Sequence, residues 1–60
     1  MDKIDKILKN ANILGYYVDG NKVNISLHYK SDANSIIKDI IKNCEYKEII
    51  HKQTKIIVVR

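Results

Sequence analysis

The sequence predicts an α+β domain in which two amphipathic helices alternate with two β-hairpins, in the order αββαββ. Apolar residues recur about every 3.6 positions near the N-terminus and again from Ser31 to Cys44. Between these helices, from Leu14 to Tyr29, and after Tyr46, the period changes to two. Because each apolar helix stripe needs a surface to pack on, we expect a four-stranded, mostly antiparallel sheet with both helices packed on one face.

The helix from Ser31 to Cys44 has the clearest pattern. Ser31 and Asp32 are each suited to cap its first turn, and Lys42 suits the negative end of its dipole. Its isoleucines are β-branched and only moderate helix formers, so packing must hold it in place. Its apolar stripe comprises Ala33, Ile36, Ile37, Ile40, Ile41 and Cys44.

The N-terminal helix is shorter and ends before Gly15. We expect Asp2 to cap it and Asp5 to favour its first turn. Its apolar positions are Ile4, Ile7, Leu8 and Ala11.

The first hairpin is predicted around Asp19-Gly20-Asn21, with a type I′ turn that needs positive φ at both central residues. A turn at Asp19 and Gly20 pairs Tyr16 with Val23, whereas a turn at Gly20 and Asn21 pairs Val18 with Val23. Either register keeps one apolar face, with Leu14, Tyr16 and Val18 on one strand and Val23, Ile25, Leu27 and Tyr29 on the other.

The C-terminal part is predicted to form a second hairpin, with strands at Tyr46 to His51 and Lys55 to Arg60. A polar turn near Lys52, Gln53 and Thr54 joins them. The complete element order is similar in topology to a circularly permuted ferredoxin-like fold.

The two halves of the chain align at an offset of 33 residues, which indicates one domain of residues 1–60 built from two αββ halves, 1–30 and 31–60. The offset places Val23 and Ile25 on Ile56 and Val58. If all four face the helices, the opposite, open side of the sheet carries Tyr17, Ile50, Ile57 and Val59.

An apolar patch of that size is typical of an interface, so we predict a homodimer through the open face at Tyr17, Ile50, Ile57 and Val59. The alternative is that the last strand is central and its outer side is covered by the chain itself, because strands buried on both sides also read as continuous apolar runs. A chain of 60 residues builds a small core, so we expect oligomerisation or a partner to supply further stability.

Composition excludes several classes of site. One cysteine forms no internal disulfide, and the Cys and His residues lack zinc-ligand spacing, so we expect no metal and no cofactor. No stretch is long and apolar enough to span a membrane, and the N-terminus lacks a signal-peptide layout. We therefore expect a reducing, cytoplasmic location without membrane contact.

Catalytic chemistry has little support in the sequence. Cys44 lies on an apolar stripe and is not brought near His28 or His51 by any spacing, and Asp19 and Asp39 occupy a turn and a solvent-facing helix side. With only two glycines there is no phosphate-binding loop. We expect a protein that is not an enzyme.

The net charge of +4 favours a polyanionic partner. We predict a small basic module that binds RNA or DNA, as a homodimer or within a ribonucleoprotein. The alternative is a protein-binding inhibitor or adaptor of the phage or viral type, which docks its apolar sheet face or sheet edge on a protein target. The candidate nucleic-acid-binding residues are Lys3, Lys6, Lys9, Lys22, Lys38, Lys42 and Lys55.

Overall fold

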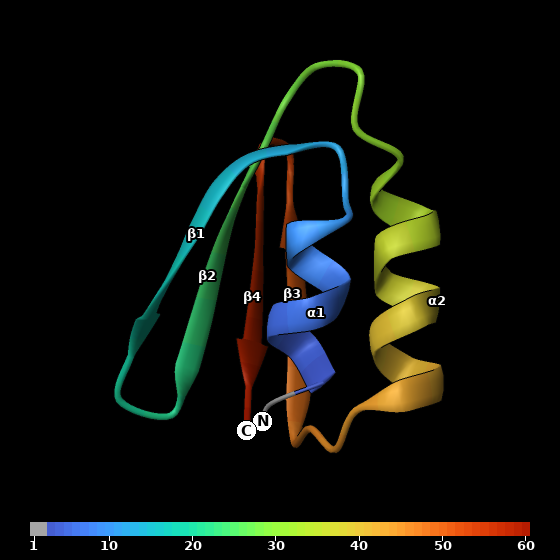
Figure 1. Cartoon of the computed structure of the whole chain (residues 1–60). Coiled ribbons are helices and arrows are strands. Elements are labelled where there is room, and N and C mark those ends of the chain that lie inside the picture. Colours follow the sequence, from blue (N-terminus) through green and yellow to red (C-terminus); the bar gives the residue numbers. More distant parts are fainter. Residues whose placement is uncertain (1–2) are drawn as a thin grey trace.

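The computed structural model describes residues 3–60 as two helices and a four-stranded antiparallel sheet (Figure 1). The sheet order is β1-β2-β4-β3, and both helices lie on one side of it (Figure 1). This confirms the predicted class and element order, and the strand order is consistent with a permuted ferredoxin-like topology. The elements are α1 (Lys3–Lys9), β1 (Ile13–Asp19), β2 (Lys22–Leu27), α2 (Ala33–Asn43), β3 (Glu48–Lys52) and β4 (Lys55–Val59).

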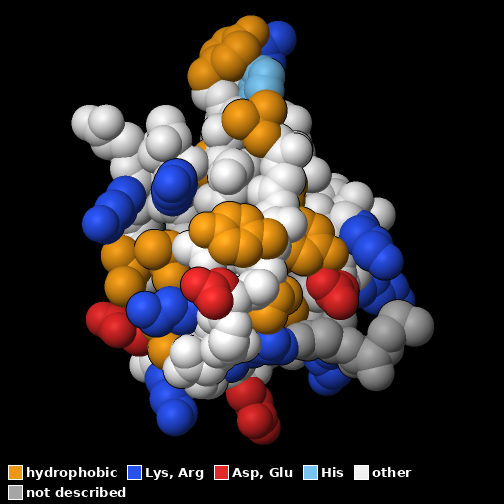
Figure 2. All heavy atoms as spheres, turned by 90° about the vertical axis from the view of Figure 1, so that its left-hand side faces the viewer, with side chains coloured by type: hydrophobic (Ala, Val, Ile, Leu, Met, Phe, Trp, Pro, Cys, Tyr) orange, Lys and Arg blue, Asp and Glu red, His pale blue; other side chains and the backbone are white. Residues whose placement is uncertain are grey.

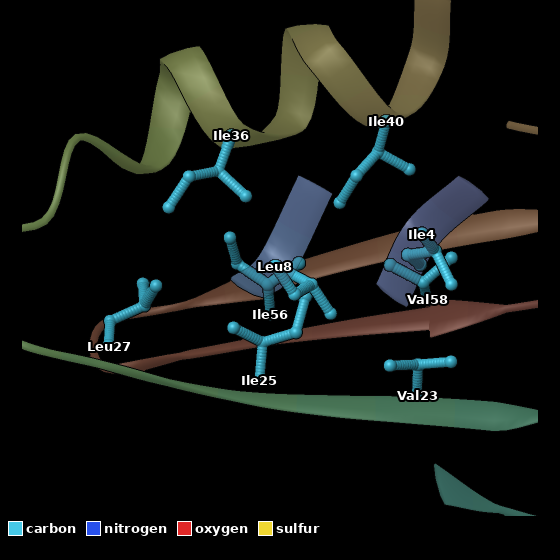
Figure 3. Close-up of a cluster of buried hydrophobic side chains, with 9 residues drawn as sticks. All are labelled: Ile4, Leu8, Val23, Ile25, Leu27, Ile36, Ile40, Ile56 and Val58. Atoms are coloured by element: carbon cyan, nitrogen blue, oxygen red, sulfur yellow. The ribbon is translucent and has the colours of Figure 1, made fainter. Parts of the chain in front are cut away.

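The core lies between the helices and the two central strands, β2 and β4 (Figure 3). Ile36 and Ile40 of α2 point toward the sheet, and alternate residues of β2 and β4 point back at them (Figure 3). The prediction that Val23, Ile25, Ile56 and Val58 face the helices is therefore confirmed. The buried set is Ile4, Leu8, Val23, Ile25, Leu27, Ile36, Ile40, Ile56 and Val58.

Helix α2 begins at Ala33, directly after Asp32, so Asp32 is the one of the two predicted caps that acts as a cap. The Asp32 carboxylate accepts a hydrogen bond from the Ser35 amide at 3.1 Å. The Ser31 hydroxyl instead donates to the carbonyl of Asn12. The predicted stripe is also too wide at Ile41, which is 50% exposed because it lies about 100° around the helix from the buried Ile40.

Helix α1 buries Ile4 and Leu8, and Ile7 and Ala11 pack partly against the core. The proposed cap Asp2 lies outside the described residues. Residue Asp5 fixes the helix to β1, because the Tyr16 hydroxyl donates a hydrogen bond of 2.7 Å to its carboxylate. No helix within residues 3–60 has the length and apolar character that crossing a bilayer requires.

The first hairpin turns at Gly20 and Asn21, since Val18 pairs with Val23 and Asp19 with Lys22. Only Gly20 has a positive φ, of 61°, in the described part of the chain. The prediction of a type I′ turn is therefore wrong. A positive φ confined to the first central residue is the pattern of a type II′ turn, which also suits the twist of a hairpin.

A β-bulge near Leu14 changes the predicted face of β1. Ile13 pairs with Leu27 and Gly15 with Ser26, so Leu14 is the extra residue and is 70% exposed. Ile13 takes the inward position that the strict alternation assigned to Leu14. Strand β2 also ends at Leu27, so Tyr29 lies beyond the sheet rather than on its apolar face.

The second hairpin is shorter than expected at its outer ends. Strand β3 begins at Glu48 rather than Tyr46, and β4 ends at Val59. The backbone continues to pair at both limits, since the Lys47 amide bonds the Val59 carbonyl at 2.7 Å and the Arg60 amide bonds the Asn21 carbonyl at 2.8 Å. Lys52 pairs with Lys55 across a turn at residues 53–54.

Candidate functional site

The open face is the side of the sheet turned away from both helices. Its central row runs across all four strands in register: Tyr17 pairs with Asn24, Asn24 with Ile57, and Ile57 with Ile50. Tyr17 is 60% exposed, whereas Ile50, Ile57 and Val59 are half-buried. The structure therefore brings the four predicted interface residues onto one surface.

Charges are distributed unevenly on the two rows beside this one. The row toward the β1–β2 turn pairs Lys22 with Asp19 and with Val59, and Val59 with Glu48. The row toward the β3–β4 turn contains Gly15, Ser26, Lys55 and Lys52, with no carboxylate. Since like charges that face each other across strands are destabilising, the Lys52–Lys55 pair costs the fold free energy that a bound anion would offset.

The basic end of the molecule comprises the connecting segments 9–13, 28–32 and 52–55, counted with the residues at which the adjoining elements end or begin; they gather at the same ends of the strands (Figure 1, top). A hydrogen bond of 2.8 Å from the Leu27 amide to the Thr54 carbonyl joins β2 to the β3–β4 turn there. These described segments contain four lysines and one carboxylate, Asp32, which caps α2. The lysines are Lys9, Lys30, Lys52 and Lys55.

Residues 28–31 form a hydrogen-bonded loop at the basic end. The Ser31 amide donates to the His28 carbonyl at 2.9 Å, and the His28 amide donates to the Ser31 hydroxyl at 2.9 Å. The Lys30 amide donates to His28 Nδ1 at 3.1 Å. The loop holds Tyr29 with 85% of its surface exposed, and Figure 2 shows a hydrophobic group beside histidine and lysine side chains at the top of the molecule.

The predicted helix lysines lie on the other layer of the molecule. Lys3 and Lys6 line a groove of about 390 Å³ with residues of both helices, whereas Lys38 and Lys42 are exposed on α2. Lys9 belongs to the basic end. The seven predicted lysines are therefore divided between two sides of the fold, and only Lys22 and Lys55 share the open face.

Cys44 and His28 are held apart by α2. His28 lies in the loop before this 11-residue helix, which is about 16 Å long, and Cys44 follows its last residue directly. Partial burial raises the pKa of the Cys44 thiol, and the nearby Lys3 opposes this effect. Cys44 instead contributes to an open pocket of about 540 Å³ that also contains Lys3, Tyr46 and Arg60.

The hydrogen bond to the Asp5 carboxylate raises the pKa of the Tyr16 hydroxyl, and desolvation and the carboxylate charge act in the same direction. Tyr16 is thus a neutral donor that ties β1 to α1. Its role is structural, since it points to the helix side and away from the open face.

Sequence reasoning missed Tyr29, Lys30 and Lys52 as candidate site residues. The period of two places Tyr29 on the apolar face of a strand, but this strand ends two residues earlier, and the polar run at 52–54 predicts a turn where Lys52 is the last residue of β3. A signal for Lys52 was present: a two-residue turn at 53–54 makes it the partner of Lys55. No comparable signal exists for the loop 28–31, whose shape depends on contacts with Asn12.

Comparison of the chain with family models, with curated proteins and with solved structures finds no match.

Proposed function

We propose that the chain is a small binding module, without catalytic activity, that holds single-stranded RNA or DNA across the open face from the basic end. The observation that carries the proposal is the row of Lys52, Lys55 and Ser26 beside the exposed Tyr17. Cations, a hydroxyl and an aromatic ring then share one surface of the sheet, on the side away from both helices. Sheet-based single-strand binders use these groups for phosphate contact and base stacking.

The balance of groups on this surface sets the expected mode of binding. The two central strands carry Asn24 and Ile57 in the middle row, so the open face offers Tyr17 alone for stacking on that row. Phosphate contact by lysines must therefore supply most of the affinity, with little sequence preference. The proposal places the module inside the cell, where nucleic acid is available and Cys44 stays reduced.

The first test is the salt dependence of binding to a labelled single-stranded homopolymer, measured by fluorescence anisotropy. Contacts from Lys22, Lys30, Lys52 and Lys55 to four phosphates predict a slope of log K against log salt of about −3. A peptide nucleic acid of the same sequence is uncharged and should not compete. Absence of binding at about 50 mM salt would contradict the proposal.

A homodimer through the open face is the second candidate, and the three contiguous aliphatic groups Ile50, Ile57 and Val59 favour it. A protein target of the inhibitor or adaptor type would use the same groups. In either case the open face would be covered by protein, which excludes nucleic acid from it.

Ile57→Lys is expected to convert such a dimer to monomers while leaving the fold intact, because Ile57 faces away from the core and a charge cannot be buried there without a partner. Sedimentation velocity at tens of micromolar measures the change. Ile41→Lys on α2 is the matched control, since Ile41 is exposed but lies on the helix layer. A wild-type chain that sediments as a monomer rules the dimer out.

A further inference from the structure

Tyr29 is the most exposed large hydrophobic side chain among the described residues, at 85%. An aromatic ring in that position contributes nothing to the core. The backbone on both sides of Tyr29 is nevertheless held. The His28 amide donates to the Ser31 hydroxyl, the Lys30 amide donates to His28 Nδ1, and the Asn12 side-chain amide donates to the Lys30 carbonyl. These hydrogen bonds hold the loop in a conformation in which the Tyr29 ring is exposed to solvent.

The groups around Tyr29 define the chemistry of its partner. The His28 ring lies 4.5 Å from the Tyr29 ring, centroid to centroid, at an angle of 31°. The Lys30 ammonium is 5.5 Å from the centre of the Tyr29 ring. Two aromatic rings and a cation on a lysine-rich end suit a partner that is flat, aromatic and anionic, which describes a nucleotide better than an apolar protein surface.

We propose that Tyr29, supported by His28, is a stacking site for one unpaired base of a single-stranded nucleic acid. Lys30 exchanges its contact with the ring for the phosphate of that nucleotide, and the next phosphates lie toward Lys52 and Lys55. The strand then runs from the loop onto the open face. This site rests on the proposed function and adds a preference for single strands, because bases inside a duplex are not free to stack on Tyr29.

Tyr29→Ala is expected to weaken binding of a single-stranded homopolymer about fivefold or more, which is the loss expected for one base–aromatic contact. Binding of an abasic strand of the same length should not change, because its phosphates are intact. Tyr46→Ala is the matched control: Tyr46 is 40% exposed and lies near the opposite end of the sheet, ahead of β3. This variant should bind both strands as the wild type does.

Tyr29→Trp supplies a second measurement, because the chain has no tryptophan of its own. Stacking of a base should quench the new fluorescence when the homopolymer binds, and the abasic strand should not. The far-UV circular dichroism spectrum of each variant checks the fold.

The possible outcomes separate this site from the proposed function. A wild type that binds neither strand overturns both proposals. A wild type that binds with the expected salt slope, together with Tyr29→Ala at equal affinity or Tyr29→Trp without quenching, overturns the stacking site alone. An equal loss for homopolymer and abasic strand also overturns it, because the residue would then act through the backbone of the nucleic acid.

Discussion

Replacement of Ile56 by alanine is expected to bring the chain to the edge of unfolding at room temperature. Ile56 of β4 is fully buried, in the core between the helices and the sheet (Figure 3). Removing its side chain costs about 2–5 kcal/mol in lost burial and cavity formation. A domain of 60 residues rarely has more than about 3–5 kcal/mol of net stability, so the loss equals most of the total.

Ile57→Ala is the matched control, because it makes the same chemical change one residue along the same strand. Ile57 is half-buried on the open face, so its truncation leaves no enclosed cavity. Urea denaturation followed by circular dichroism should show a much lower midpoint for Ile56→Ala and a small shift for Ile57→Ala. Equal shifts would mean that the two sides of β4 are equally packed and that the open face is covered.

The side on which each residue of β2 and β4 lies could be predicted from the sequence, because side chains alternate strictly in a paired strand. One register fits Val23, Ile25, Ile56 and Val58 to the helices, and a slip of one residue would expose all four. The helix positions Ile36 and Ile40 follow from the same reasoning at a period of 3.6. Burial of a continuous core therefore specifies these positions more strongly than any local preference.

The details that could not be predicted depend on single hydrogen bonds. Ser31 and Asp32 are equally good caps in isolation, but Ser31 is used by the loop that contacts Asn12 and His28. The bulge at Leu14 adds one unpaired residue to β1, and the residue types of the strand do not indicate where it lies. Tertiary contacts decide between such nearly equal local alternatives, and the hydrophobic period of the sequence does not predict those contacts.

The candidate site was only partly predictable for a related reason. Periodicity places Lys3, Lys6 and Lys9 on one helix face. A binding site needs groups from other elements beside that face, and periodicity does not predict which elements lie there. The basic end combines Lys9, Lys30 and the β3–β4 turn, which belong to three segments far apart in the chain. They meet because the strand order places β4 beside β2.

Reversing both charges of the Lys52–Lys55 pair is expected to weaken nucleic-acid binding about 25-fold or more near 0.1 M salt. Each phosphate contact on a single strand contributes about fivefold at that salt through release of counterions, so two lost contacts multiply. The slope of log K against log salt should fall in magnitude by about 1.4. Lys52→Glu with Lys55→Glu also keeps two like charges facing each other, so the stability of the hairpin should change little.

The control is Lys38→Glu with Lys42→Glu, which makes the same change of charge on the solvent side of α2. Because both double variants lower the formal net charge from +4 to zero, any difference between them reports position and not total charge. The α2 variant should bind nearly as the wild type does, with a long-range loss that disappears as salt increases. An equal loss of affinity in the two variants would mean that the overall charge of the molecule holds the nucleic acid. The proposal that the open face is the binding site would then be wrong.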